Sequence, residues 1–221
     1  MMKVINYTKN PISYMGEVAG ICWGSDTSSV DKNLKRGFDC INANHGRVME
    51  YPDVTLVIDE YSARVIREVY TSIIGVTRLQ ESTRYVNCSD FKYYIPDSIV
   101  NNDKALKIYD DLMDIIGDSY DKLIELGIPK EDTANVLPLA SHTKIVYKIN
   151  LRALINLNEV RECSRVYKEY RNLMRELNVI LSKLDNEWLW LSENAFKCSC
   201  EKTGICRETK SCGRYKLYVK E

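Results

Sequence analysis

Two segments that are far apart in the sequence each concentrate side chains that can bind an anion. The first segment, residues 77–85, carries Arg78, Gln80, Ser82, Thr83 and Arg84. The second segment, residues 150–161, carries Asn150, Arg152, Asn156 and Arg161. An arginine guanidinium stays charged and presents a rigid fork of donors that matches phosphate oxygens. The two segments together therefore indicate a phosphorylated ligand such as a nucleotide.

Each segment also has a plainer interpretation. The first follows Gly75, which gives the chain a flexible joint, and its hydroxyls, amides and backbone N–H groups can surround phosphate oxygens. A solvated loop has the same composition. In the second, Arg152 opens an expected helix and Asn156 falls four residues later on the same face. A polar helix face in water remains the alternative there.

Eight cysteines add a third group of reactive side chains. Four of them lie near the C-terminus with the spacing C-x-C, five residues, C, five residues, C, namely Cys198, Cys200, Cys206 and Cys212. Four thiolates can hold zinc, although this spacing is not a common zinc pattern, and free thiols in a loop-rich tail are the alternative. The others, Cys22, Cys40, Cys88 and Cys163, are expected to be reduced and mostly buried.

Composition excludes several classes of protein. The 221 residues include 31 Lys and Arg against 31 Asp and Glu, so no basic field exists to attract nucleic acid. No apolar run approaches the roughly 20 residues that span a bilayer, and the N-terminus is too polar for a signal peptide. Neither a Walker loop nor a Gly-x-Ser-x-Gly elbow occurs. We therefore expect a cytoplasmic protein that binds neither membrane nor nucleic acid.

The elements that must position these side chains follow from periodicity. Strands are expected over residues 3–7, 54–58, 85–86, 91–95 and 143–149. Helices are expected over residues 12–22, from Ser62 toward Gly75, over 105–126, just after Pro129, and over 152–188 with a break near Glu159. Residues 25–31 are expected to form a polar loop. The pattern predicts an α+β fold with a small, mostly antiparallel sheet packed with long helices.

Taken in order, the motifs resemble those of the flavin-dependent thymidylate synthase family, also called the thymidylate synthase complementing protein family. The resemblance covers residues 3–190. Its matching segments are Asn6–Pro11, Cys22-Trp23, Gly46 with Glu50-Tyr51, Leu79–Tyr85 with its Ser-x-Arg-Tyr ending, Val136–Leu139, the series Asn150, Arg152, Asn156 and Arg161, and Glu169–Arg171. We expect one domain over residues 1–190 and a cysteine-rich tail over residues 191–221.

The resemblance implies an activity, cofactors and an assembly. It implies FAD that is reduced by NADPH, methylene-tetrahydrofolate as one-carbon donor, and transfer to C5 of deoxyuridylate to give thymidylate. It also implies a homotetramer whose sites are shared between subunits. No protein nucleophile attacks the base in this chemistry, so the protein orients ligands and polarises the pyrimidine.

The same resemblance implies residue roles. The nucleotide would be bound by Gln80, Ser82, Thr83, Arg84 and Arg161, with Arg161 against the pyrimidine as the catalytic residue. The flavin would be contacted by Arg78, Asn150, Arg152 and Asn156. No metal site is part of this chemistry.

One half of the family signature is missing. The usual Arg-His-Arg is replaced by Thr71-Ser72-Ile73 or Ser72-Ile73-Ile74, and Ala134 stands where an arginine often reaches the phosphate. Each lost charged hydrogen bond costs about 1.5–3 kcal/mol of binding, unless Arg78, Arg47 or Arg67 compensates. Three interpretations stay open: a divergent synthase, a related C5 modification of another pyrimidine nucleotide, and a catalytically silent nucleotide-binding protein.

Overall fold

The computed structural model describes residues 2–218, which divide into two compact units. Unit 1 comprises Ile58–Thr71 and Leu79–Val146, and unit 2 comprises the remaining described residues. The sheet is antiparallel and has the strand order β1-β2-β4-β3. Its strands are β1 (Met2–Tyr7), β2 (Asp53–Ser62), β3 (Val76–Gln80) and β4 (His142–Asn150). The predicted fold class, a small antiparallel sheet packed with long helices, is confirmed.

Alternation of apolar residues explains the two long strands. In β2 every second residue from Val54 to Ile58 is buried, and in β4 the same holds from Ile145 to Ile149. A strand with one buried face requires this period of two. These buried residues form part of the hydrophobic core, and each of the two strands is followed directly by a helix.

Unit 1 contains strand ends, helices and an irregular segment over residues 81–96. Its helices are α3 (Ala63–Val69), α4 (Asp97–Val100), α5 (Asp103–Glu125) and α6 (Lys130–Thr133), followed by a 3₁₀ turn at Ala134–Val136. Ser62 accepts a hydrogen bond from the Val65 backbone at the start of α3, as the sequence predicted. However, α3 ends at Val69, well before Gly75.

The long helix α5 confirms one prediction and corrects another. Its bounds agree with the expected helix over 105–126, and Gly127 ends it at φ +80°. The two short strands predicted at 85–86 and 91–95 do not form, and in that segment Tyr93 makes a single bridge to Ser141. The tyrosines there pack against α5 instead, because Tyr109 donates to the Tyr94 carbonyl and Tyr93 donates to Asp110.

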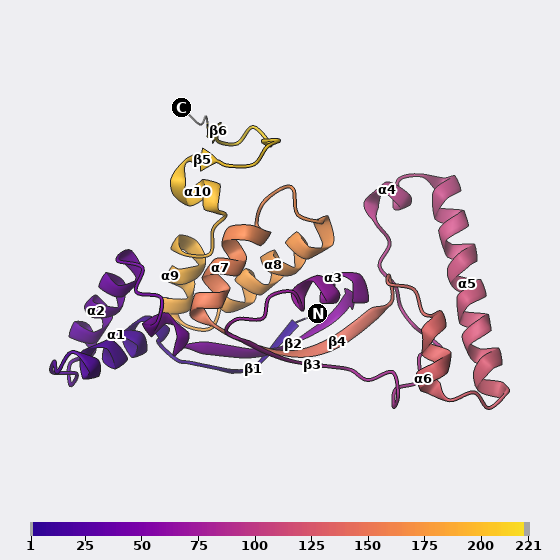
Figure 1. Cartoon of the computed structure of the whole chain (residues 1–221), viewed down its shortest axis with the longest axis horizontal. Helices are drawn as coiled ribbons and strands as arrows, with labels where there is room; N and C mark the ends of the chain where they lie inside the picture. Colours follow the sequence, from indigo (N-terminus) through magenta and orange to yellow (C-terminus); the bar gives the residue numbers. More distant parts are fainter. Residues whose placement is uncertain (1, 219–221) are drawn as a thin grey trace. The chain divides into compact units, whose positions relative to one another are not determined.

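Unit 2 contains the remaining elements. Its helices are α1 (Pro11–Cys22), α2 (Val30–Asn42), a 3₁₀ turn (Val48–Glu50), α7 (Leu151–Arg161), α8 (Lys168–Leu181), α9 (Asn186–Asn194) and α10 (Ser199–Thr203), and its small second sheet joins β5 (Ile205–Cys206) to β6 (Lys216–Leu217). Helices α7, α8 and α9 lie together (Figure 1), with α8 against β1. Helix α2 was not predicted, although Ser29 caps it.

The expected long helix over 152–188 is three helices. It breaks at residues 162–167, just beyond the predicted position, and again at residues 182–185, where Asp185 caps α9. Glu187 on α9 in turn accepts hydrogen bonds from the Ile12 and Ser13 backbones at the start of α1. The sequence analysis divided the chain into a domain over residues 1–190 and a tail over residues 191–221. Helix α9 runs across residue 190, and this division stays a prediction. Among the described residues, no helix is both long and apolar enough to cross a membrane.

Candidate functional site

The second predicted segment begins at the junction where strand β4 ends and helix α7 starts. Asn150 caps α7, because its side chain accepts a hydrogen bond from the Ala153 backbone at 2.9 Å. Its own backbone N–H donates to the Gly75 carbonyl at 2.9 Å. Gly75 has φ +73°, and a Cβ atom at this position would lie 2.6 Å from Asn150 Oδ1. Glycine is therefore required for the turn after α3 to reach the head of α7.

A polar cleft opens at this junction. It has a volume of about 310 Å³, at the lower end of the roughly 300–1,000 Å³ typical of ligand sites. It is lined by Glu50, Asp53, Gly75, Val76, Thr77, Lys148 and Asn150. The cleft therefore combines the turn after Gly75 with the head of α7, which are the two places where the sequence predicted ligand binding to begin.

Both carboxylates of the cleft are paired with cations. Lys148 Nζ lies 2.9 Å from Asp53, and Arg152 Nη1 lies 2.6 Å from Glu50. Gly46 permits the second pair, because a Cβ atom there would lie 2.8 Å from the Arg152 guanidinium. The structure thus brings Gly46 and Glu50, from one of the family-like segments, together with Arg152 from another. These charges cancel, so the cleft suits hydrogen-bonding groups of a ring or sugar better than a bare phosphate.

Two buried tyrosines, Tyr147 and Tyr170, each interact with one of the predicted arginines. The Arg161 guanidinium lies 4.6 Å from the centre of the Tyr170 ring, a cation–π contact. Burial raises the pKa of Tyr147, the Tyr170 phenol raises it further, and the Arg78 guanidinium lowers it. Within the described residues, the buried Tyr147 hydroxyl has no hydrogen-bond partner. A buried polar atom of this kind is a common sign of a ligand or water position.

The predicted residues on α7 divide between its two ends. Arg152 and Asn156 are both exposed, as expected for one face of the helix. Arg161 follows Arg152 by nine residues and so lies about 14 Å further along the helix axis. A separate polar network was missed by the sequence analysis: Asn158 is buried and accepts from Asn178 Nδ2 at 2.7 Å. An asparagine within a helical sequence gives no signal for such a pairing.

The remaining predicted residues are exposed or half-buried, and all of them except Arg78 belong to unit 1. Arg78 and Gln80 lie in strand β3, which corrects the expectation of a loop over residues 77–85. Gln80 Nε2 donates to the Thr143 hydroxyl at 3.2 Å, and Arg84 Nε forms an ion pair with Glu131 at 2.8 Å. Ser82 accepts from the Arg84 backbone N–H at 3.3 Å, while Thr83 is exposed.

The C-terminal cysteines form a compact group. Cys198, Cys200 and Cys206 are buried with Cys163 packed against them, and Cys212 is exposed. In the part of the chain that the structure describes, no group of three or more His, Cys, Asp or Glu side chains is arranged to hold a metal ion. The zinc hypothesis therefore gains no support. Of the scattered cysteines only Cys40 is fully buried, and Cys22 is exposed, contrary to expectation.

Comparisons with known proteins agree on one family. The family model described as thymidylate synthase complementing protein matches residues 3–185. A flavin-dependent thymidylate synthase of Clostridium tetani is 26% identical over 96% of this chain and 93% of its own length. One from Geobacter sulfurreducens is 27% identical over 79% of this chain and 78% of its own length.

Two solved structures share the fold. A UMP/dUMP methylase from Streptomyces cacaoi, bound to 5-Br dUMP, superposes with a TM-score of 0.73 at 14% identity, covering 89% of this chain and 96% of that one. Thymidylate synthase X from Helicobacter pylori, with FAD and dUMP, has a TM-score of 0.69 at 20% identity, covering 89% of this chain and 99% of that one. At these identities the likeness establishes the fold alone.

Proposed function

Because this chain belongs to the thymidylate synthase complementing protein family, we propose that it transfers a one-carbon unit from methylene-tetrahydrofolate to C5 of deoxyuridylate. FAD is the cofactor, NADPH is the reductant and thymidylate is the product. The observation that carries the proposal is the cleft at the head of α7, which is lined by the family-like residues Glu50 and Asn150. Arg152 pairs with Glu50 beside this cleft, and Gly46 lies against the Arg152 guanidinium.

The residues of the cleft fit part of a flavin nucleotide. Thr77 and Lys148 offer donors and Asn150 offers both donor and acceptor, which suits the polar edge of the flavin ring or its ribose. The paired carboxylates argue against a phosphate at the same place. When bound, FAD supplies the redox chemistry, and the protein contributes position and hydrogen bonds.

Arg78 is placed to compensate for the missing Arg-His-Arg motif. Its Nη1 donates to the Ser72 carbonyl at 2.8 Å, so this guanidinium lies beside the segment that replaces the usual motif. In our proposal Arg78 takes over part of the cofactor-binding role, together with Asn150, Arg152 and Asn156. A single arginine restores fewer charged hydrogen bonds than two, which predicts weaker flavin retention than the complete motif gives.

The nucleotide-binding role is assigned to Gln80, Ser82, Thr83 and Arg84, with Arg161 against the pyrimidine. Arg161 rests on the Tyr170 ring, so its guanidinium is held in one orientation before ligand arrives. A fixed positive charge beside the pyrimidine carbonyls stabilises negative charge that develops when C5 becomes nucleophilic.

The proposal includes self-association. Helix α5 leaves an apolar stripe uncovered within the chain, formed by Ile108, Leu112 and Ile115, which are 71%, 50% and 61% exposed. Their spacing of four and three residues places them on one face of the helix. An exposed apolar stripe of this kind is typical of a surface that packs against another subunit, which agrees with a homotetramer.

The experiment that tests the function begins with the absorption spectrum of the purified chain. A synthase gives a flavin spectrum, either as isolated or after FAD is added, and oxidises NADPH faster when deoxyuridylate and the folate donor are present. Product analysis then identifies thymidylate. A chain that takes up no FAD contradicts the proposal.

The alternative acceptor is tested in the same assay. The proposal predicts turnover with deoxyuridylate above that with uridylate or deoxycytidylate. Turnover confined to another pyrimidine nucleotide favours the related C5 modification instead. Nucleotide binding without turnover, with FAD, NADPH and folate donor all present, identifies a catalytically silent protein.

A further inference from the structure

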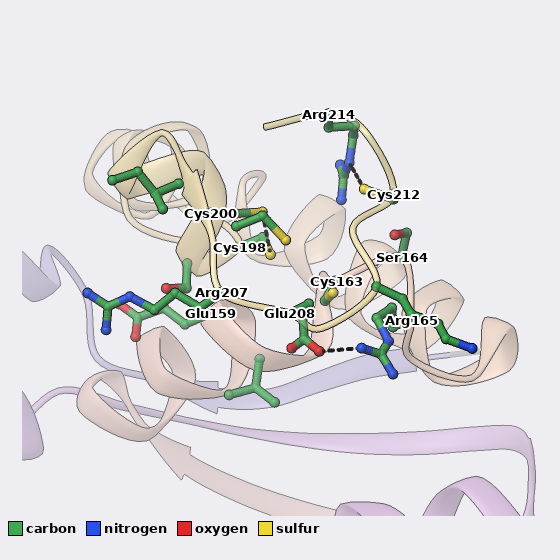
Figure 2. A pocket seen from close by; sticks show the side chains of 15 residues that line it. Glu159, Cys163, Ser164, Arg165, Cys198, Cys200, Arg207, Glu208, Cys212 and Arg214 are labelled. Atoms are coloured by element: carbon green, nitrogen blue, oxygen red, sulfur yellow. Dashed lines mark hydrogen bonds and ion pairs between the residues drawn. The ribbon is translucent and has the colours of Figure 1, made fainter. Parts of the chain in front are cut away.

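A second cavity, which we call the thiol pocket, lies where the C-terminal tail meets the end of α7. It has a volume of about 190 Å³ and is lined by five of the eight cysteines: Cys163, Cys198, Cys200, Cys206 and Cys212. Figure 2 shows Cys163, Cys198, Cys200 and Cys212 together with charged side chains around them. This pocket includes residues 198–214, which lie beyond the family match and have no part in the proposed function.

The thiols of the pocket differ in accessibility. Cys198, Cys200 and Cys206 are buried, and the Cys198 and Cys200 sulfurs lie 3.4 Å apart. Burial raises the pKa of Cys198, so its thiol stays protonated and unreactive at neutral pH. Cys212 is exposed. Cys163 is half-buried, so Cys212 is the thiol of the pocket that a reagent in solution reaches most easily.

Two polar neighbours activate Cys212. Ser164 and Arg214 hydrogen-bond to its sulfur, and Arg214 Nε lies 3.4 Å from it. Together these contacts lower the pKa of Cys212 to about 6. The thiolate is the nucleophilic form of cysteine, so Cys212 is largely reactive at neutral pH.

The pocket also favours anions. Its charged lining residues are Arg165, Arg207, Lys210, Arg214, Glu159 and Glu208, a surplus of two positive charges. Both carboxylates are already paired, Glu208 with Arg165 at 2.8 Å and Glu159 with Lys202 at 3.0 Å. An anionic reagent is therefore attracted to the pocket.

We propose that the thiol pocket is a site of thiol–disulfide exchange, at which Cys212 reacts with an anionic low-molecular-weight disulfide of the glutathione disulfide class. The Cys212 thiolate attacks one sulfur of the disulfide and forms a mixed disulfide. The original S–S bond breaks, the other half leaves as a thiolate, and this thiolate takes a proton from water. No electrons are supplied from elsewhere, because the disulfide is the oxidant.

The test uses the reduced full chain and the anionic aromatic disulfide 5,5′-dithiobis(2-nitrobenzoate). Peptide mass spectrometry identifies which cysteine reacts first. At pH 6 Cys212 is about half ionised, whereas an ordinary thiol of pKa about 8.5 is ionised to well under 1%, and the lower nucleophilicity of the more acidic thiol offsets part of this difference. We expect Cys212 to react roughly tenfold faster than Cys22, the other exposed cysteine.

Matched variants assign the fast reaction. Cys212→Ser removes it and Cys22→Ser leaves it unchanged. Arg214→Gln slows it at pH 6 and moves its pH midpoint upward, because the donor that stabilises the thiolate is lost. Added salt slows the reaction of Cys212 more than that of Cys22, since it screens the surplus positive charge.

Two results overturn the proposal. One is a fast phase that survives Cys212→Ser. The other is a chain isolated with one equivalent of zinc whose Cys212 reacts only after a chelator is added, which identifies the pocket as a metal site.

Discussion

Arg161 is the residue on which the proposed chemistry depends most directly. Its guanidinium is held over Tyr170, and the proposal places it against the pyrimidine. Arg161→Ala removes one charged hydrogen bond to the reacting ring, worth about 1.5–3 kcal/mol, so kcat/KM for deoxyuridylate is expected to fall about 10- to 150-fold. Steady-state kinetics measure this change. Lys35→Ala, a loss of positive charge on the exposed side of α2, is the control and leaves the kinetics unchanged.

Glu162, which directly follows α7, gives a prediction about pH. Burial raises the pKa of its carboxyl, and Arg175 opposes this shift. Its neutral form is therefore favoured by the fold, so the stability contributed at low pH is lost as pH rises from about 4.3 through the raised pKa. Glu162→Gln, which can still accept from Asn178, is expected to raise the melting temperature at pH 7 but not at pH 4.

Thermal unfolding at the two pH values measures this difference. Glu193→Gln on the exposed side of α9 is the matched control and leaves the melting temperature unchanged at both. An equal rise at pH 4 and pH 7 for Glu162→Gln would mean that packing, and not ionisation, is responsible.

At the residue scale, the sequence predicted which residues lie close together better than it predicted the contacts of each side chain. Asn150, Arg152 and Gly46 were found because their spacing matches a family motif, and the structure brings them together. The partners of Arg161 and Arg78 were not predicted, because Tyr147 and Tyr170 are buried aromatic residues whose spacing is that of any core. Which residues contact ligand remains a prediction.

At the element scale, the turn that carries Gly75 to the head of α7 can be tested by substitution. Gly75→Ala is expected to lower the free energy of unfolding for two reasons. An L-residue at φ +73° costs about 1–2 kcal/mol, and its Cβ would lie 2.6 Å from Asn150 Oδ1. Gly127→Ala has only the backbone strain, because its φ is +80° but no atom lies within 4 Å of the added Cβ.

Urea denaturation of both variants separates the two effects. We expect Gly75→Ala to lose at least 1 kcal/mol more than Gly127→Ala, since moving Asn150 also weakens the cap of α7, a contribution of about 1 kcal/mol. Equal losses would show that the clash is relieved without disturbing the cap.

Elements with strong periodicity were predicted well, and elements defined by their neighbours were not. The long helix α5 and the strands β2 and β4 follow from the spacing of apolar residues. Strand β3 was taken as a loop because its sequence, Val76–Gln80, is half polar, and its pairing with β4 supplies the hydrogen bonds that its composition does not suggest. Helix α2 was missed for a similar reason, since only Asn33, Gly37 and Cys40 of its residues are buried.

At the scale of the whole molecule, the exposed stripe on α5 predicts assembly. Leu112→Asp places a charge in the centre of the stripe and is expected to reduce the mass of the particle, because an unpaired charge in an apolar interface is costly. Light scattering after size-exclusion chromatography measures the mass. Asp121→Lys, on another exposed face of α5, is the control that leaves it unchanged. An unchanged mass for Leu112→Asp rules out this stripe as an interface.

Helix α7 fixes the distance along its axis between two of the predicted arginines, Arg152 and Arg161. Its first turn holds Arg152 against Glu50, and its last turn holds Arg161 on Tyr170, about 14 Å along the axis at 1.5 Å per residue. A single pyrimidine ring is far shorter than this interval. A pyrimidine ring held against Arg161 therefore leaves Arg152 to bind a different group, either on a second molecule or at the far end of a longer one.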